Sequence, residues 1–309
     1  MPRWISQLGC IKGCLDYLGL AVSDAWLYGS TGQAFVLNVH EVVCPSGPTA
    51  WNTERVLRLA GNVGGRIDGV FGSRGCGNLA RKRREAWQYA KSALDQGLPC
   101  YAWELQVPEY YVVNGYDEVA YHFSGPGQDA ETGPKPWTSL GDTGIGIVEM
   151  YSVEAIEPAP RARAVREALA FALEHATNPE KWIFPHYRSG LDGYEMWIRA
   201  LESATADGMG VAYNAAAWCE CRGYAVLFLE EAREFLDGQV AHLLEQVTGS
   251  YRAVHDNLKQ VVECFPVHDG QPDRVRDSSR VRTTLDALRR ARDAEAAGLQ
   301  GLEAIVDTL

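Results

Sequence analysis

Apolar residues near the N-terminus recur at the spacing of a helix that buries one side. The apolar positions of this stretch are Ile11, Cys14, Leu15 and Leu18. Gly19 follows them, at the point where a left-handed residue commonly ends a helix. Ser23 can cap a second short helix, and Gly29–Gly32 then turns the chain into an apolar run at 34–39. The pattern therefore predicts two short helices, a glycine-rich turn and a strand.

The middle of the chain contains runs typical of β-strands. The clearest run is Glu109–Tyr116, which is followed across Asp117 by Glu118–Phe123 and so predicts a hairpin. Further strands are predicted at 66–71, 99–107 and 147–156. An amphipathic helix at Arg83–Gln96 lies between them in the sequence. This region therefore predicts an antiparallel sheet accompanied by helices.

After Pro158–Pro160 the pattern becomes helical. Helices are predicted from Arg161 to the stop at Asn178-Pro179, and over 194–204, 212–236, 240–265 and 279–309. We therefore expect an α+β fold in two domains, an N-terminal domain at 1–157 with an antiparallel sheet and an α-helical domain at 158–309. Apolar residues between Leu285 and Leu309 predict a seam against a neighbouring helix or, in a homodimer, against a second copy.

Composition narrows the class of protein. The chain has 309 residues, 46% of them hydrophobic, and no apolar run approaches the ~18–20 residues that a membrane span needs. Its N-terminus lacks the apolar block of a secretory signal, and its eight cysteines show no framework spacing. We therefore expect a cytoplasmic protein with free thiols and no membrane partner. The net charge of −11 disfavours a nucleic-acid partner.

Two motifs resemble a known group of families. One motif is a helix ending in Tyr17-Leu18-Gly19, followed by a short helix and Gly29–Gly32, and the other is Glu109–Asp117, EYYVVNGYD. Together they resemble the papain-like C39-type peptidase fold, and most closely the butirosin-biosynthesis acyltransferase-like family. The later stretches GLDGYEMW at 190–197 and YNAAAWCEC at 213–221 resemble the helical region of that family. The resemblance implies a papain-like N-terminal domain followed by helices.

The resemblance also implies where catalytic residues would lie. The family's nucleophilic Cys opens the first helix, and that position holds Ser6 here. The family's His position holds Glu109, or Tyr110 if the register moves by one, and no Asp or Asn stands at 123–126 for the orienting residue. Because all three positions depart from the pattern, we expect a degenerate cysteine-peptidase-fold protein. It would bind a small molecule or a peptide without triad catalysis.

Two other functions stay open from the sequence. If the first helix started at Gly9, Cys10 would lie near its N-terminus, where a thiol is activated. His122 could then serve as the base, oriented by Asp117 or Glu109, in a cysteine-dependent amide hydrolase or acyl transferase. Against this, Cys10 lies on the apolar side of the helix, where Cys packs as a small hydrophobe. The remaining alternative is a helical dimerisation or scaffold protein.

Two regions are candidates for ligand binding. The first lies between the first helix and the strand at 103–111, and its candidate residues are Trp103, Glu104, Tyr110 and Tyr111. The second is a loop–helix junction whose candidate residues are His186, Arg188 and Asp192. A helix N-terminus beside an arginine suits an anion or a carboxylate, although the same aromatic-rich junction also suits packing between elements.

No cofactor or metal is expected. His40 with Cys44, and Cys219 with Cys221, would each supply two ligands, whereas structural zinc usually takes four. Cys219 and Cys221 would also point about 200° apart on one helix.

Overall fold

The computed structural model describes residues 3–127, 132–267 and 275–309. The chain forms two compact units. Unit 1 comprises Met1–Val22 and Val63–Pro158, and unit 2 comprises Ser23–Asn62 and Ala159–Leu309. This confirms the α+β class, the antiparallel sheet and the helical C-terminal region. It differs from the expected domain at 1–157, because residues 23–62 belong to the helical unit.

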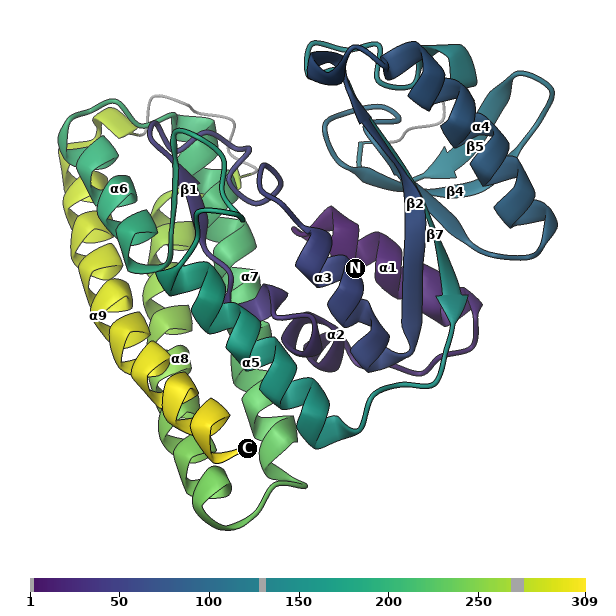
Figure 1. The fold of residues 1–309 in the computed structure, drawn as a ribbon. Coiled ribbons are helices and arrows are strands. Elements are labelled where there is room, and N and C mark those ends of the chain that lie inside the picture. Colours follow the sequence, from purple (N-terminus) through teal and green to yellow (C-terminus); the bar gives the residue numbers. More distant parts are fainter. Residues whose placement is uncertain (1–2, 128–131, 268–274) are drawn as a thin grey trace. The chain divides into compact units, whose positions relative to one another are not determined.

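Unit 1 contains a six-stranded sheet with the strand order β2-β7-β3-β4-β5-β6. Its strands are β2 (Gly65–Ser73), β3 (Cys100–Trp103), β4 (Tyr110–Tyr116), β5 (Ala120–Ser124), β6 (Lys135–Pro136) and β7 (Ile147–Ala155), and neighbours pair antiparallel (Figure 1). The predicted hairpin is confirmed as β4 and β5. The Asp117 side chain stabilises its turn by accepting hydrogen bonds from the backbone N–H groups of Val119 and Ala120 at 2.8 and 2.9 Å.

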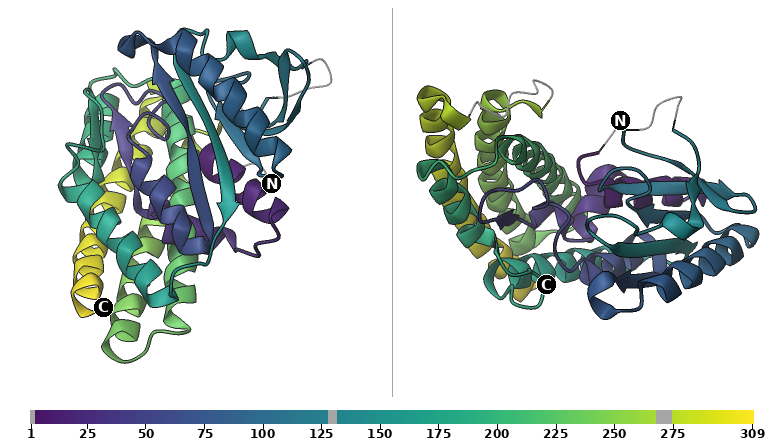
Figure 2. Two further views of the ribbon diagram at one scale, coloured as in Figure 1. Left: turned by 45° about the vertical axis from the view of Figure 1, so that its right-hand side comes forward. Right: turned by 90° about the horizontal axis from the view of Figure 1, so that it is seen from above.

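Helices α1 (Ser6–Tyr17) and α4 (Leu79–Asp95) cover opposite faces of this sheet (Figure 2). Trp87 of α4 belongs to a buried cluster with Tyr111 and other alternate residues of the strands. Ser6 of α1 instead contacts the backbone of Tyr110, and Gly13 lies against Val112. Because successive strand residues point to opposite faces, Tyr110 and Tyr111 lie under different helices.

Unit 2 is built mainly from long helices. They are α5 (Arg161–Thr177), α6 (Gly190–Glu202), α7 (Gly208–Arg233), α8 (Gly238–Cys264) and α9 (Ser278–Thr308). The shorter elements are α2 (Asp24–Ser30), the 3-10 helix Gln33–Phe35, α3 (Glu54–Leu59) and the ribbon of β1 (Asn38–His40) with β8 (Tyr187–Ser189). A strand was expected at 34–39, but the chain forms the 3-10 helix Gln33–Phe35 there, followed by the short strand β1. Ser23 caps α2 as predicted, accepting from the N–H of Trp26 at 2.9 Å.

Residues 23–62 join unit 2 because its helices hold their side chains and backbone. The ring of Phe35 lies 5.0 Å from that of Tyr251 on α8. Arg222 of α7 donates hydrogen bonds to the carbonyls of Ala34 and Val36 at 2.9 and 2.8 Å. These contacts join positions 188 and 186 residues apart in the sequence.

The same arginine forms a buried ion pair. Its Nε and second terminal nitrogen donate to the two carboxylate oxygens of Glu295 on α9, at 2.8 and 2.9 Å. The Arg222 and Glu295 side chains are 0% and 1% exposed. Tyr194 of α6 donates a further hydrogen bond to Glu295 at 3.1 Å. The pair therefore links α6, α7 and α9 with the segment that precedes β1.

The predicted seam on α9 is covered by helices of the same chain. Leu288, Leu299 and Leu302 are buried, and α9 packs along α8 and also against α5 and α6 (Figure 1). These three positions therefore serve the packing of α9 within the chain, whereas Leu285 and Leu309 at the two ends of the predicted seam are partly exposed. Throughout the described ranges, no helix combines the length and the apolar character needed to cross a membrane.

Candidate functional site

The start of α1 brings together Ser6 and Glu109, the two residues that the resemblance places at a nucleophile and a base position. Helix α1 begins at Ser6, whose side chain is 6% exposed. The Ser6 hydroxyl donates a hydrogen bond to the carboxylate of Glu109, just before β4. Its oxygen also accepts from the backbone N–H of Tyr110 at 3.0 Å. Ser6 therefore links the first turn of the helix to the first residue of the strand.

This pair lacks the chemistry of a Cys–His dyad. A serine hydroxyl is a weak nucleophile unless a strong base takes its proton. A carboxylate, whose ordinary pKa is about 4.3 for Glu, is a weaker base than imidazole. Because the Ser6 oxygen is also engaged by a backbone N–H, the arrangement holds the hydroxyl rather than activating it.

Cys10 does not lie at the helix start. Since α1 begins at Ser6 and not at Gly9, Cys10 lies in the second turn and is 5% exposed. Burial raises the pKa of its thiol well above the usual value, and the nearby Cys14 and Glu109 raise it further. The thiol is therefore protonated at neutral pH, which is the opposite of an activated nucleophile.

His122 and Asp117 do meet, as the enzyme alternative requires, but at the surface of the hairpin. The Nε2 atom of His122 lies 3.1 Å from Oδ2 of Asp117, and these side chains are 50% and 43% exposed. The pKa of Asp117 is lowered, first by the N–H of Val119 and then by Ala120 and His122. Within the described residues no hydrogen bond joins His122 to Cys10.

A carboxylate that the sequence analysis did not single out lies near Tyr110. Glu149 of β7 is partly buried and accepts a hydrogen bond from the hydroxyl of Tyr110, which reaches it across strand β3. Burial raises the pKa of Glu149 to about 7, while hydrogen bonds from Tyr110 and Tyr151 oppose this shift. The available signal in the sequence was that Glu149 is the one charged residue in the predominantly apolar run Ile147–Val153.

The first set of predicted ligand residues is largely buried in unit 1. Trp103 and Tyr110 are 7% and 5% exposed, and their rings lie 5.0 Å apart. Glu104 is 5% exposed and accepts from the Thr143 hydroxyl at 2.8 Å. Tyr111 lies in the core under α4, so one ligand cannot contact both Tyr110 and Tyr111.

An apolar groove of about 270 Å³ lies farther along α1. It is lined by Gly13, Cys14, Tyr17, Leu94, Gly97, Leu98, Pro99, Val112, Val113 and Asn114. We expected a pocket between the first helix and the strand at 103–111. The groove instead uses the C-terminal half of that helix and the next strand residues.

The second predicted ligand region lies in unit 2. His186 pairs with Glu41, with Nδ1 and Oε1 3.1 Å apart, and the guanidinium of Arg188 donates to the backbone carbonyl of Tyr187 at 2.7 Å. Helix α6 begins at Gly190 rather than at Tyr194, so Asp192 is an exposed residue of its first turn and not its cap.

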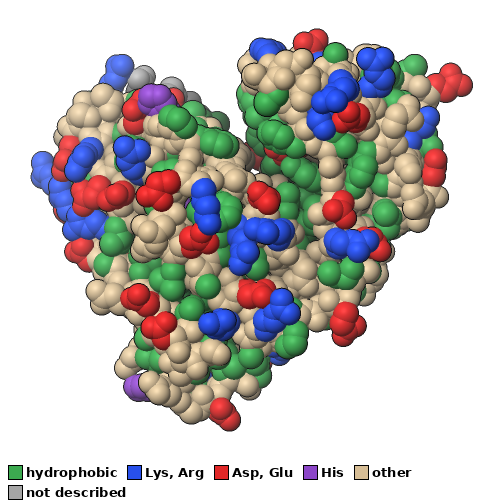
Figure 3. All heavy atoms as spheres, in the orientation of Figure 1, with side chains coloured by type: hydrophobic (Ala, Val, Ile, Leu, Met, Phe, Trp, Pro, Cys, Tyr) green, Lys and Arg blue, Asp and Glu red, His purple; other side chains and the backbone are tan. Residues whose placement is uncertain are grey.

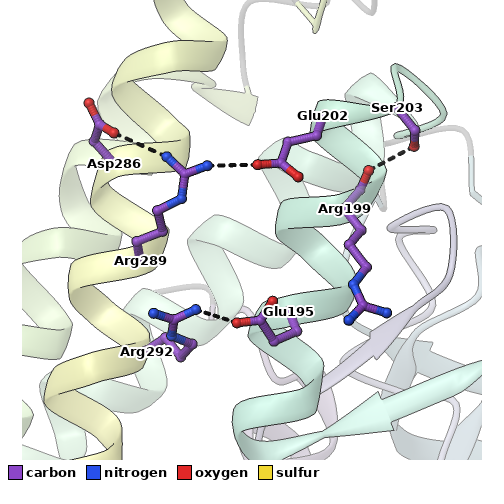
Figure 4. Close-up of polar contacts among 7 residues, drawn as sticks. All are labelled: Glu195, Arg199, Glu202, Ser203, Asp286, Arg289 and Arg292. Atoms are coloured by element: carbon purple, nitrogen blue, oxygen red, sulfur yellow. Dashed lines mark hydrogen bonds and ion pairs between the residues drawn. The ribbon is translucent and has the colours of Figure 1, made fainter.

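Helix α6 is held to α9 by ion pairs (Figure 4). Glu202 accepts from Arg289 at 2.6 Å, and Glu195 pairs with Arg292. Acidic and basic side chains are interspersed over the visible surface of unit 2 (Figure 3). Of the two roles considered for the junction of His186, Arg188 and Asp192, these contacts of α6 favour packing between helices over binding of an anion.

Metal-ligating side chains do not gather in the part of the chain that the structure describes. No group of three or more His, Cys, Asp or Glu side chains there could hold a metal ion. The cysteines are free thiols, including Cys44, Cys219 and Cys221.

The sequence matches no protein-family model, and no curated protein is significantly similar to it. The function proposed below therefore depends on the geometry around Ser6 and on the motifs at 17–32 and 109–117.

Proposed function

We propose that this chain is a papain-fold, C39-like protein with a degenerate catalytic triad, and that it binds a small molecule or a peptide without covalent catalysis. The observation that carries the proposal is the hydrogen bond between Ser6 and Glu109. These residues stand at the positions where the resemblance places a nucleophile and its base. Their contact keeps the helix–strand geometry of such a site and replaces its reactive groups.

The state of Cys10, the cysteine that follows Ser6 on α1, also supports the absence of covalent catalysis. Nucleophilic cysteines need a stabilised thiolate, and burial of Cys10 favours the neutral thiol instead. His122 is occupied by Asp117 on the exposed hairpin. The described groups around α1 therefore lack an activated nucleophile with a base beside it.

Unpaired polar groups under α1 support binding. The Tyr101 hydroxyl and the Nε1 atom of Trp103 are buried and have no hydrogen-bond partner. Buried polar groups are nearly always paired, because an unpaired one costs about 1–3 kcal/mol. Both residues lie on the sheet face that carries Tyr110 and Glu149, so this face retains hydrogen-bonding capacity that a ligand would use.

The test is site-resolved labelling of the native protein with iodoacetamide between pH 5 and pH 9, read by mass spectrometry. We expect exposed Cys76 to label first at every pH, and buried Cys10 to label only as the protein opens. A compound library is then screened by thermal shift, and each stabilising compound is recovered and weighed by mass spectrometry.

Binding without catalysis predicts that stabilising compounds are recovered unchanged. Rapid labelling of Cys10 near pH 6, or turnover of a compound that is lost in Cys10→Ala, would instead establish the cysteine-dependent hydrolase or acyl transferase. The thermal melt of Cys10→Ala shows whether that variant remains folded.

A further inference from the structure

Four side chains form a row across the sheet at the level where α1 begins. Phe71 of β2 pairs with Glu149 of β7, and Trp103 of β3 pairs with Tyr110 of β4. Ala102 pairs with Met150, which brings the neighbouring Trp103 opposite Glu149. We call Phe71, Glu149, Trp103 and Tyr110 the acid–aromatic row. Cross-strand partners on one face lie about 5 Å apart, so these side chains are immediate neighbours.

The row is closed at one end and open at the other. Trp103 and Tyr110 are 7% and 5% exposed, whereas Phe71 is 53% exposed. Glu149 lies between them and is partly exposed. Glu149 therefore lies at the boundary between the buried rings of Trp103 and Tyr110 and the exposed ring of Phe71.

The groups around Glu149 are aromatic or hydroxylic rather than basic. The hydroxyls of Tyr110 and Tyr151 hydrogen-bond to its carboxylate. The ring of Tyr101 lies 5.2 Å from that of Tyr151 and 5.9 Å from that of Tyr110. In the described ranges, no Lys, Arg or His forms an ion pair with Glu149. The site therefore combines a carboxylate with ring faces and lacks a cation of its own.

The geometry points to the acid–aromatic row as a binding site for an organic ammonium group, with Glu149 as the counter-ion and Phe71 as the ring that covers the cation. Ammonium groups are attracted to the faces of aromatic rings and to carboxylates, and the two attractions strengthen when water is excluded. This inference rests on the proposed function, because it names the class of ligand for the same face of unit 1.

The titration of Glu149 supplies a readout that depends on charge. Burial raises its pKa to about 7, so the carboxylate is only partly ionised at neutral pH. The other titratable groups near this region are the phenols of Tyr101, Tyr110 and Tyr151, the α1 thiols of Cys10 and Cys14, and the carboxylate of Glu109, which is bonded to Ser6. Burial raises the pKa of each of these phenols and thiols, so they stay neutral below pH 8.

The test compares benzylamine with benzyl alcohol on the full chain, by titration calorimetry at pH 8 and pH 6. We expect the amine to bind at least about tenfold more tightly than the alcohol at pH 8, since a hydrogen bond between two charged groups is stronger than one between a charged and a neutral group. From pH 8 to pH 6 its affinity should fall about tenfold, because Glu149 with a pKa of about 7 becomes protonated.

Two variants locate the site. Glu149→Gln should lower the affinity for the amine at pH 8 about tenfold and remove its dependence on pH. Phe71→Ala should lower it about threefold, and because that side chain is exposed, this variant keeps the test valid if Glu149→Gln fails to fold. The matched controls are Glu154→Gln, an acid at the other end of β7 that pairs with Arg66, and Val119→Ala, an exposed apolar residue.

Equal affinities for amine and alcohol, or an unchanged affinity in both site variants, would overturn the ammonium site. If a library compound still stabilises both variants, the binding function stands and only this site is lost. If Cys10 proves to be an activated thiolate, the proposed function itself fails whatever the amine does.

Discussion

The hydroxyl of Ser6 makes two hydrogen bonds. It donates to the carboxylate of Glu109 and accepts from the backbone N–H of Tyr110. That N–H belongs to a residue that is 5% exposed. Ser6→Ala removes the acceptor and leaves the N–H buried without a partner. We expect the free energy of unfolding to fall by about 1–3 kcal/mol, measured by urea denaturation.

Ser92→Ala is the matched control for this change. Ser92 is an exposed serine of α4 in the same unit, and its loss should change stability by no more than about 0.5 kcal/mol. Equal effects of the two variants would show that the Ser6 hydrogen bonds do not hold α1 to β4.

At the scale of elements, α7 and α9 are joined through the buried pair of Arg222 and Glu295. Replacing Arg222 by Met leaves Glu295 as an unpaired buried charge. We expect a loss of about 3–5 kcal/mol in the free energy of unfolding, from urea denaturation. The double variant Arg222→Met/Glu295→Leu should recover much of that loss, since it removes both charges together.

An exposed pair in the same unit gives the comparison. Arg289 and Glu202 join α9 to α6, and their side chains are 45% and 46% exposed (Figure 4). Arg289→Met should cost at most about 1 kcal/mol, because solvent screens such pairs. If Arg222→Met costs no more than Arg289→Met, the buried pair is not what holds these helices.

At the scale of the whole molecule, unit 1 is discontinuous, since the chain leaves it after Val22 and returns at Val63. Residues 1–157 alone would carry Phe35 and Leu27 without the helices of unit 2 that bury them. Leu20 and Gly64 are close, because a Cβ on Gly64 would lie 3.7 Å from Cδ1 of Leu20. A short Gly/Ser linker between Val22 and Val63 can therefore replace residues 23–62, which belong to unit 2.

We expect the linked chain, residues 1–22 joined to 63–158, to unfold cooperatively and to remain monomeric. Residues 1–157 should aggregate, because their exposed apolar surface belongs to another core. Near-ultraviolet circular dichroism and size-exclusion chromatography distinguish the two. The continuous domain at 1–157 would be supported instead if only that fragment unfolds cooperatively.

Local pattern was enough to predict most elements. The hairpin of β4 and β5, the cap at Ser23 and the long helices of unit 2 each depend on residues within a few positions of one another. Gly19 adopts φ +74 at the end of α1, as its place after the apolar positions predicts. The predicted starts of helices were less accurate. Helix α4 begins at Leu79 and α6 at Gly190, each four residues before the predicted start.

The sequence by itself therefore determined the class of fold and the order of its elements, and its resemblance to the papain-like families directed attention to Ser6 and Glu109. Only the tertiary structure placed residues 23–62 with the helices, decided between the two possible starts of α1 and brought Glu149 to Tyr110. The physical reason is separation along the chain. Periodicity and capping act between near neighbours, whereas burial and the pKa of Glu149 are set by side chains that only packing brings together.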